Sequence, residues 1–225
     1  MNKNYKSAIS KIEDKLYSPT EAIKLLKEIS YEKFDPSFMI SMNLNLNTKH
    51  ADQQLRGSVI LPHGTGVSKK VLVIAEGENA DLAKQAGADH VGGPEMLEKI
   101  QKENWFDFDV IVTSPSFMPK FGKYGKLLGT KKLMPNPKLG TVSEDIKKAV
   151  ENVKKGQIEY KTDSEANINI NFGKKSFTDE QLVENYTEMF NLIHGLKPAK
   201  VKGKYIKTVT LSTTMSPGIK IQFDN

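Results

Sequence analysis

The residues of this chain best suited to binding a ligand are lysines that have no acidic residue near them in the sequence. The segment 110–143 contains six lysines and no acidic residue, with glycines, prolines and aromatic residues between them. Such a basic, aromatic-studded loop suits a phosphate backbone, because lysines neutralise phosphates and aromatic rings stack on bases. A solvated loop in a lysine-rich protein is the alternative. The lysines are Lys120, Lys123, Lys126, Lys131, Lys132 and Lys138, and the aromatic residues are Phe117, Phe121 and Tyr124.

A second acid-free basic segment begins near Leu192. No acid lies between Glu188 and Asp224, and the segment includes the last pair of expected strands. Two such segments indicate one extended polyanion rather than a small anion in a pocket, and roughly five to eight phosphate contacts would make binding steeply salt-dependent. A solvated basic face is again the alternative. The lysines of this segment are Lys197, Lys200, Lys202, Lys204, Lys207 and Lys220.

The run Thr213-Thr-Met-Ser-Pro-Gly218 combines small hydroxyls, a flexible methionine and a Pro-Gly turn. These groups are not a catalytic set, but they could hydrogen-bond sugars and bases while Met215 packs on a base. An ordinary hairpin turn is the alternative. Ser41, Asn43 and Asn45 have the same neutral, hydrogen-bonding character and alternate along one predicted strand.

Motifs of enzymes and metal sites are weak or missing. The loop His63–Lys70 lacks the spacing of a nucleotide-binding loop and leads into a strand rather than a helix. The chain has no cysteine, and its four histidines lack metal-ligand spacing. We therefore expect no catalytic residue, no metal and no cofactor. The alternative is an α/β enzyme acting on a phosphorylated small molecule, with Glu76 and Glu78 after a strand as its acids.

The composition of the 225 residues fits a soluble protein with an anionic partner. Lys and Arg number 33 against 27 acids, a net charge of +6, and Arg56 is the only arginine. Because lysine is a point charge, RNA binding here could not rest on bidentate arginine contacts. The longest apolar run, Val71–Ala75, is far shorter than a membrane-spanning helix, and Met1–Lys6 lacks the apolar stretch of a secretory signal. We expect a cytoplasmic protein with no membrane partner.

Both ends of the chain are predicted to contain capped helices and amphipathic strands with one apolar face. Ser18 and Glu21 form a capping box before a helix predicted over 18–30. Alternation over 38–47 predicts a half-buried strand, whose partner would be Arg56–Pro62. Towards the C-terminus we expect a hairpin of 158–161 and 166–172, a helix capped by Thr178 and Gln181, and strands over 205–213 and 218–223.

The middle of the chain alternates short apolar strands with helices, a pattern typical of a small parallel sheet. Strands are predicted over 70–75 and 108–113. A helix over 143–155 would be capped by Ser143 and stopped by Gly156. The other predicted helices cover 80–86 and 94–101.

These patterns predict an α/β fold of two domains. Residues 1–66 and 157–225 would form a discontinuous α+β domain with a mainly antiparallel sheet. Residues 67–156 would form an inserted, Rossmann-like, three-layer α/β domain with a small parallel sheet. The predicted hinge residues, at the two crossings between domains, are Gly64, Gly66 and Gly156.

Short motifs of specific sequence are spread over nearly the whole chain. They are Lys33-Phe-Asp35, Asp52-Gln-Gln-Leu-Arg-Gly57, Leu61-Pro-His-Gly64, Ala86-Gly-Ala-Asp-His-Val-Gly-Gly93, Leu133-Met-Pro-Asn-Pro-Lys-Leu-Gly-Thr-Val142, Gly173-Lys-Lys-Ser-Phe177 and Ser212-Thr-Thr-Met215. At these separations the set resembles the bacterial L-one family of large-subunit ribosomal stalk proteins.

The resemblance implies the two-domain fold and a function without catalysis. Members of that family bind a helical junction of large-subunit rRNA and form a mobile stalk that helps deacylated tRNA leave the exit site. Bacterial members also bind their own operon mRNA and repress its translation. The resemblance further implies a protein that is monomeric within the ribosome. A non-specific nucleic-acid binder is the remaining alternative.

The rRNA contacts implied by the resemblance fall at both ends of the chain. Lys33 and Phe34 precede the first strand, and Thr214 and Met215 lie near the last one. In the inserted domain, we expect Lys131 and Lys132 to face tRNA. The full set of predicted rRNA-binding residues is Lys33, Phe34, Ser41, Lys174, Ser176, Thr213, Thr214, Met215 and Ser216.

The chain departs from the family pattern at two places. The family usually has glycine after Thr-Thr-Met, where this chain has Ser216. Because glycine allows positive φ, we expect the serine to weaken a close backbone contact with RNA or to replace it with a hydroxyl bond. The family usually has Gly-Pro-Arg/Lys-Gly before Leu-Met-Pro-Asn-Pro, where this chain has Gly129-Thr-Lys-Lys132, which keeps the charge but alters the loop.

Overall fold

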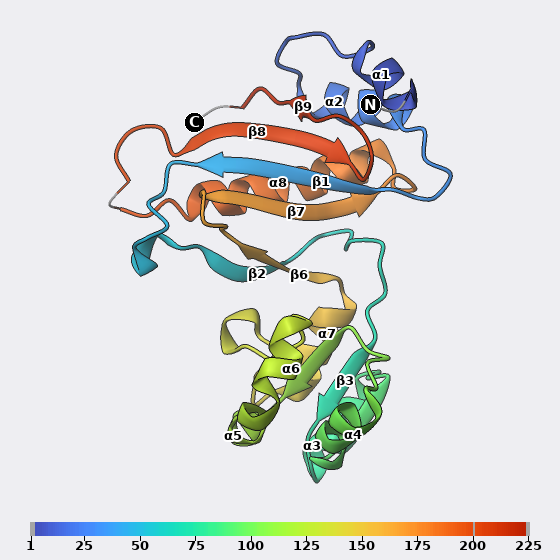
Figure 1. Cartoon of the computed structure of the whole chain (residues 1–225), viewed down its shortest axis with the longest axis vertical. Helices are drawn as coiled ribbons and strands as arrows, with labels where there is room; N and C mark the ends of the chain where they lie inside the picture. Colours follow the sequence, from blue (N-terminus) through green and yellow to red (C-terminus); the bar gives the residue numbers. More distant parts are fainter. Residues whose placement is uncertain (1–2, 200, 224–225) are drawn as a thin grey trace. The chain divides into compact units, whose positions relative to one another are not determined.

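The computed structural model describes residues 3–199 and 201–223, so Lys200 of the second basic segment lies outside the described residues. The chain divides into two compact units (Figure 1). The terminal unit comprises Met1–Gly66 and Glu159–Asn225, and the inserted unit comprises Val67–Ile158. An antiparallel sheet in the first and a parallel sheet in the second confirm the predicted mixed α/β fold class.

The terminal unit is built on a four-stranded antiparallel sheet in the order β7-β1-β8-β9. Residues alternate strictly along β1, so that Phe38, Ile40, Met42 and Leu44 are buried. This alternation confirms the predicted half-buried strand, which ends at Leu44 rather than at residue 47. The strands are β1 (Ser37–Leu44), β7 (Asn167–Lys174), β8 (Ile206–Thr213) and β9 (Ile219–Lys220).

Two helices, α2 (Pro19–Ile29) and α8 (Asp179–Gly195), cover the apolar face of this sheet (Figure 1). Both predicted capping boxes are present, since Ser18 pairs with Glu21 and Thr178 pairs with Gln181. The short helix α1 (Lys3–Ile9) precedes them. Both helices lie on the same side of the sheet.

The strand partners predicted for β1 and for the 158–172 region are wrong. Strand β2 (Arg56–Ile60) pairs with β6 (Gln157–Lys161) in a separate ribbon, whereas β1 lies between β7 and β8. Consequently β6 and β7 do not form a hairpin, and one isolated bridge, Thr162 to Ile168, joins their ends. Gly57 allows this close pairing of β2 with β6, since a Cβ there would clash with the Tyr160 hydroxyl oxygen.

The inserted unit has three layers around a parallel sheet in the order β4-β3-β5. One face packs against α3 and α7, and the other packs against α4 and the segment that contains Phe117, Phe121 and Leu128. The central strand β3 has every residue buried. The elements are β3 (Val71–Ile74), α3 (Glu78–Gln85), β4 (His90–Gly92), α4 (Glu95–Glu103), β5 (Val110–Thr113) and α7 (Ile146–Lys154).

The predicted cap of α7 is wrong by two residues. Asp145, not Ser143, is the N-cap, and its carboxylate accepts a hydrogen bond from the Lys148 amide at 3.1 Å. Ser143 instead accepts a hydrogen bond from the Asp145 amide at 3.2 Å, so it holds the cap in place. Gly156, with a φ of +91°, follows the end of this helix as predicted.

The basic segment of the inserted unit is not the open loop that its glycines and prolines predict. It folds into short helical turns whose aromatic side chains turn inward, with Phe121 fully buried and Phe117 nearly so. These rings therefore belong to the core and are withdrawn from any nucleic acid. The turns are η2 (Pro115–Phe117), α5 (Met118–Phe121), η3 (Gly122–Tyr124), α6 (Gly125–Thr130) and η4 (Pro137–Leu139).

Candidate nucleic-acid interface

Three loops meet at one end of the terminal sheet: residues 30–36 before β1, residues 175–178 after β7 and residues 214–218 after β8. The first and third loops are joined by the Tyr31 hydroxyl, which donates to the Met215 carbonyl at 2.9 Å. The Ser37 amide also donates to the Thr214 hydroxyl oxygen at 3.0 Å. We call this meeting point the loop junction. These hydrogen bonds hold its backbone through contacts within the protein.

The second loop is attached to the first through a carboxylate. Asp35 accepts hydrogen bonds from the Ser176 amide at 3.0 Å and from the Ser176 hydroxyl at 2.8 Å. The Lys175 amide donates to the Pro36 carbonyl at 3.0 Å, and the Lys175 ammonium donates to the Ser30 carbonyl at 3.3 Å. Predicted residues that are more than 140 positions apart, such as Lys33 and Ser176, are thereby brought to one end of the sheet.

The acids near the loop junction are used to hold protein groups. Glu32 accepts from the Ser30 hydroxyl at 2.5 Å and lies 3.5 Å from the Thr213 hydroxyl. At the other end of β7, hydrogen bonds led by that from the Asn167 amide lower the pKa of Asp163. Donors within the protein therefore occupy oxygens of both carboxylates, which offsets part of their repulsion of an anionic ligand.

The side chains left exposed at the loop junction are of three chemical kinds. Lys33 supplies a positive charge and Thr214 supplies a hydroxyl, and both are exposed. Phe34 is 53% exposed and Met215 is 46% exposed, although burial is the usual state of such large apolar side chains. A charge, a hydrogen-bonding group and two uncovered apolar surfaces are what a nucleotide requires of a binding protein.

The open face of the terminal sheet continues this surface with neutral polar side chains. Ser41 lies opposite Asn169 on β7 and Thr210 on β8. The Asn43 side-chain NH₂ donates to the Asn167 side-chain oxygen at 2.7 Å, and none of the four strands contains an acid. The face is formed by Ser37, Met39, Ser41, Asn43, Asn167, Asn169, Asn171, Thr208, Thr210 and Ser212.

Four other residues singled out in the sequence do not present a free side chain on the open face. Thr213 lies opposite Phe38 and is only 3% exposed, so its side chain faces the core and not the open face. Asn45 lies beyond the end of β1, where its amide donates to the Tyr205 carbonyl at 2.7 Å. Lys174 is half-buried, and the exposed Ser176 is engaged with Asp35.

Comparison with known proteins decides the family. The profile of the ribosomal protein L1p/L10e family matches residues 26–217. The chain belongs to this family. Its members are ribosomal proteins and not enzymes, so the α/β enzyme alternative is set aside.

Among residues 3–199 and 201–223 there is no group of three side chains that could hold a metal ion, and no helix of that part is long and apolar enough to cross a membrane.

Individual relatives are similar over almost their whole length. A protein of Mesoplasma florum named large ribosomal subunit protein uL1 is 52% identical over 99% of this chain and 96% of its own. The protein of the same name in Lactobacillus acidophilus is 52% identical over 97% of this chain and 95% of its own. That of Persephonella marina is 48% identical over 97% of this chain and 92% of its own.

The two departures from the family pattern have different structural consequences. Ser216 is not among the described residues with positive φ, and its hydroxyl accepts from the Thr213 amide at 2.8 Å and donates to the Pro217 carbonyl at 3.1 Å. The serine thus closes the turn. Lys132, by contrast, has a φ of +59°, the left-handed conformation that favours the glycine usual at this position.

The tRNA-facing candidates lie in the inserted unit, separate from the loop junction. Lys131 and Lys132 are both exposed. The Lys131 ammonium lies 4.2 Å from the centre of the Phe106 ring, and the Lys120 ammonium lies 4.5 Å from that of Phe117. These lysines cover aromatic rings, so the surface that they present is cationic.

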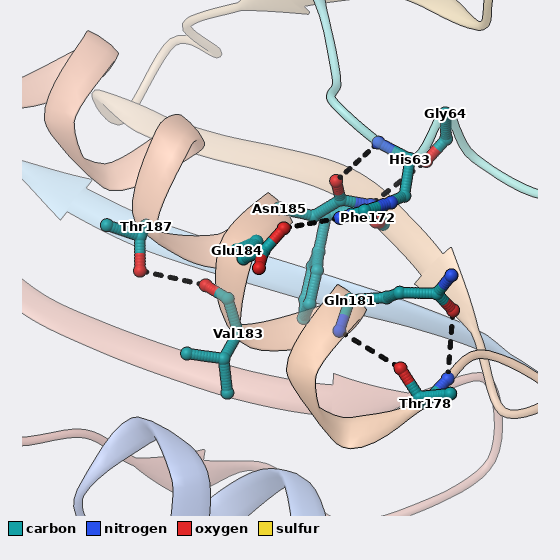
Figure 2. A network of polar contacts seen from close by, with 9 residues as sticks. All are labelled: His63, Gly64, Phe172, Thr178, Gln181, Val183, Glu184, Asn185 and Thr187. Atoms are coloured by element: carbon teal, nitrogen blue, oxygen red, sulfur yellow. Dashed lines mark hydrogen bonds and ion pairs between the residues drawn. The ribbon is translucent and has the colours of Figure 1, made fainter.

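The predicted hinge glycines on the first crossing are tied to the terminal unit (Figure 2). The buried Asn185 side chain accepts from the His63 amide at 3.2 Å and donates to the carbonyls of Gly64 at 3.0 Å and Phe172 at 2.8 Å. A Cβ on Gly66, which has a φ of +73°, would come within 2.9 Å of the Phe177 ring. These contacts attach residues 63–66 to the terminal unit, and a hinge at Gly64 and Gly66 stays a prediction.

Sequence reasoning missed Tyr31, Asp35 and Ser37, which hold the loop junction together. Their partners are distant in the sequence, and no local pattern identifies such pairs. It also missed most of the open face beyond β1. For that face a signal exists, since Asn167, Asn169 and Asn171 recur at every second position of a strand.

Proposed function

We propose that this chain is a structural rRNA-binding protein of the large ribosomal subunit, in the cytoplasm. The observation that carries the proposal is the loop junction, where Lys33, Phe34 and Met215 are exposed beside an acid-free sheet face. Relatives that are about half identical over almost the whole chain are named large ribosomal subunit protein uL1, which supports the same assignment.

The proposed contacts divide into two kinds. Lysines such as Lys33 and Lys174 neutralise phosphates, so they supply affinity that falls with salt. The Ser41 and Thr214 hydroxyls hydrogen-bond riboses and base edges, while Phe34 and Met215 pack against bases. Stacking of a base on an aromatic ring contributes about 1–3 kcal/mol, so Phe34 is the strongest single contact of this proposal.

The finer proposal concerns movement and regulation. In it, the bound protein forms a mobile stalk that assists release of deacylated tRNA from the exit site, with Lys131 and Lys132 facing that tRNA. Gly64, Gly66 and Gly156, all with positive φ, act as the hinge. The protein is monomeric within the ribosome and needs no cofactor. The same loop junction binds a similar structure in its own operon mRNA and represses translation.

A salt titration of RNA binding tests the central proposal. The full chain is titrated with a folded rRNA stalk junction between low and physiological salt, with a scrambled hairpin of equal length as competitor. We expect a Kd that rises with salt but stays measurable, and binding that resists the competitor. Steep loss of binding with no preference would replace the proposal with non-specific nucleic-acid binding through a basic surface.

Repression has its own test. The leader of the operon mRNA should compete with the rRNA junction for one site on the full chain, because both occupy the loop junction. Simultaneous binding of both RNAs would contradict a shared site.

A further inference from the structure

Sulfur chemistry in this chain is confined to methionine. The sequence has eight methionines and no cysteine. In the part of the chain that the structure describes, Met42 and Met189 are fully buried, and Met215 is 46% exposed. The other described methionines, Met39, Met96, Met118 and Met134, are intermediate. Because oxidation of a thioether requires access by the oxidant, Met215 is, among the seven methionines that the structure describes, the one that a dissolved oxidant meets first.

Oxidation of Met215 would alter its exposed side chain without disturbing the backbone of its loop. The backbone on either side is fixed, since Tyr31 donates to the Met215 carbonyl at 2.9 Å and Ser216 accepts from the Thr213 amide at 2.8 Å. The Met215 side chain is exposed, and the loop that Tyr31 joins to it carries the exposed Lys33. A chemical change at the sulfur therefore alters the binding surface and leaves the fold in place.

We propose that Met215 is a peroxide-sensitive modification site that controls RNA binding by the free protein. The proposal deepens the rRNA-binding function above and rests on it. A thioether lone pair attacks one oxygen of hydrogen peroxide and the O–O bond breaks. The sulfur keeps that oxygen as a sulfoxide, and the other oxygen leaves as water after proton transfer. Sulfur loses two electrons and the peroxide gains them, so no further reactant is needed.

The product is incompatible with the contact that the thioether makes. A methionine side chain packs on a base through its flexible, polarisable sulfur, whereas a sulfoxide is polar and must give up hydrogen bonds to water when a base covers it. Removal of this packing corresponds to about a tenfold weaker Kd. Bound RNA would cover the sulfur, so the modification acts on protein that has not yet assembled. Methionine sulfoxide reductases return the thioether, which makes the effect reversible.

The experiment uses the full chain and limiting hydrogen peroxide. Peptide mass spectrometry follows each sulfoxide over time, with and without the folded rRNA junction, and the Kd is measured before and after oxidation. We expect Met215 to oxidise before the other described methionines, RNA to protect it, and the Kd to rise about tenfold. Treatment with two methionine sulfoxide reductases, one for each sulfoxide epimer, should restore the starting Kd.

Two variants assign the effect to one sulfur. Met215→Leu, compared with its own untreated Kd, should lose no affinity with peroxide, whereas Met118→Leu, a change in the inserted unit, should lose as much as the unsubstituted chain. Loss of affinity in oxidised Met215→Leu, earlier oxidation of another described methionine, or an unchanged Kd in protein oxidised at Met215 would each overturn the inference and leave the rRNA-binding function intact. Failure of the untreated chain to prefer the rRNA junction would overturn the proposed function itself.

Discussion

Both units combine lysines with large apolar side chains, but the two units expose different surfaces. The inserted unit carries lysines and aromatic residues without acids over 110–143, yet its Phe117 and Phe121 are buried under short helical turns. The terminal unit also carries lysines without nearby free acids, but it leaves Phe34 and Met215 exposed at the loop junction. One region is a cationic surface, and the other adds apolar and hydrogen-bonding groups that can recognise a base.

The difference shows that basic composition does not identify a recognition site. Lysines bind phosphates of any sequence, so a surface with only lysines supplies salt-dependent affinity without preference. Recognition needs exposed groups held in fixed positions, which the terminal unit achieves by using Asp35 and Tyr31 to join its loops. The following predictions separate the two units, from the largest effect to the smallest.

Asn185→Ala should destabilise the terminal unit alone, by about 3 kcal/mol. The substitution leaves the His63 amide and the Gly64 and Phe172 carbonyls without their buried partner, and unsatisfied buried groups are costly. Trp105, the only tryptophan, lies in the inserted unit with its ring 5.3 Å from that of Phe108. Urea unfolding should therefore shift when followed by far-UV circular dichroism but not by tryptophan fluorescence.

Thr187→Ala is the matched control for Asn185→Ala. Thr187 lies on the exposed side of the same helix, where its hydroxyl donates to the Val183 carbonyl at 2.8 Å (Figure 2). Its removal should change stability by less than about 0.5 kcal/mol. Equal shifts in both variants, or an equal shift of the tryptophan signal in Asn185→Ala, would contradict a clamp that belongs to the terminal unit.

Met215→Ala should weaken binding to the rRNA junction about tenfold without changing the melting curve, because an exposed side chain contributes to RNA binding and not to the core. Tyr31→Phe, which keeps the ring but loses the hydrogen bond to the Met215 carbonyl, should have a smaller effect in the same direction. Kd by filter binding and thermal unfolding by circular dichroism check both variants. Binding like that of the unsubstituted chain would remove Met215 from the site.

Substitutions of lysines in the inserted unit should change the affinity for RNA without changing the preference for one RNA. The double variant Lys131→Gln/Lys132→Gln should lose the same factor in affinity for the rRNA junction and for a scrambled hairpin. For each phosphate that the variant no longer neutralises, the slope of log K against log salt should become shallower by about 0.7–0.9. A preference for one RNA that disappears in this double variant would show that the inserted unit also reads sequence, and the contrast between the units would fail.

Local signals in the sequence identified most elements, whereas partners distant in the chain were not predictable. The capping boxes of α2 and α8 are complete within four residues, so both helices were found. The pairing of β1 was not, because its neighbours β7 and β8 follow more than 100 residues later, and the nearer β2 pairs elsewhere. Chain proximity is a weak guide when a whole domain is inserted between two partners.

The candidate site could be predicted to the same extent. Lys33, Phe34, Thr214 and Met215 were predicted through motifs, and the structure brings their loops together, while their contact with RNA stays a prediction. Thr213 was misjudged because a one-residue step along a strand reverses the face of the sheet. In the inserted unit, the i, i+4 spacing of Phe117 and Phe121 is a helical signal that glycines and prolines obscured.

The inserted unit should lose stability in acid through Asp89. The hydrogen bond from the Lys154 ammonium, at 2.6 Å, is the main cause of a lowered pKa of this carboxyl, and the Val71 amide adds a second donor at 2.7 Å. Because the folded pKa lies below the unfolded one, the stabilisation is present above the unfolded pKa, near 4, and is lost as pH falls through the folded pKa.

Asp89→Asn measures that contribution. It should cost the inserted unit about 1 kcal/mol at pH 7, a value that allows for solvent screening of a partly exposed ion pair, and should flatten the acid limb of its stability curve. Urea unfolding followed by Trp105 fluorescence between pH 3 and 7 gives both quantities. An acid limb of unchanged steepness would assign the acid sensitivity to other carboxyls.

Lys132→Gly should stabilise the inserted unit by about 0.5–1 kcal/mol, although glycine usually destabilises. Lys132 has a φ of +59°, a conformation that strains any residue with a Cβ, and its relief exceeds the extra entropy of glycine in the unfolded chain. Lys131→Gly is the matched control, since Lys131 has a φ of −91° and loses its position over the Phe106 ring, so it should lose stability. The two neighbouring substitutions remove the same charge, and opposite shifts of the Trp105 unfolding curve therefore isolate the backbone conformation as the cause.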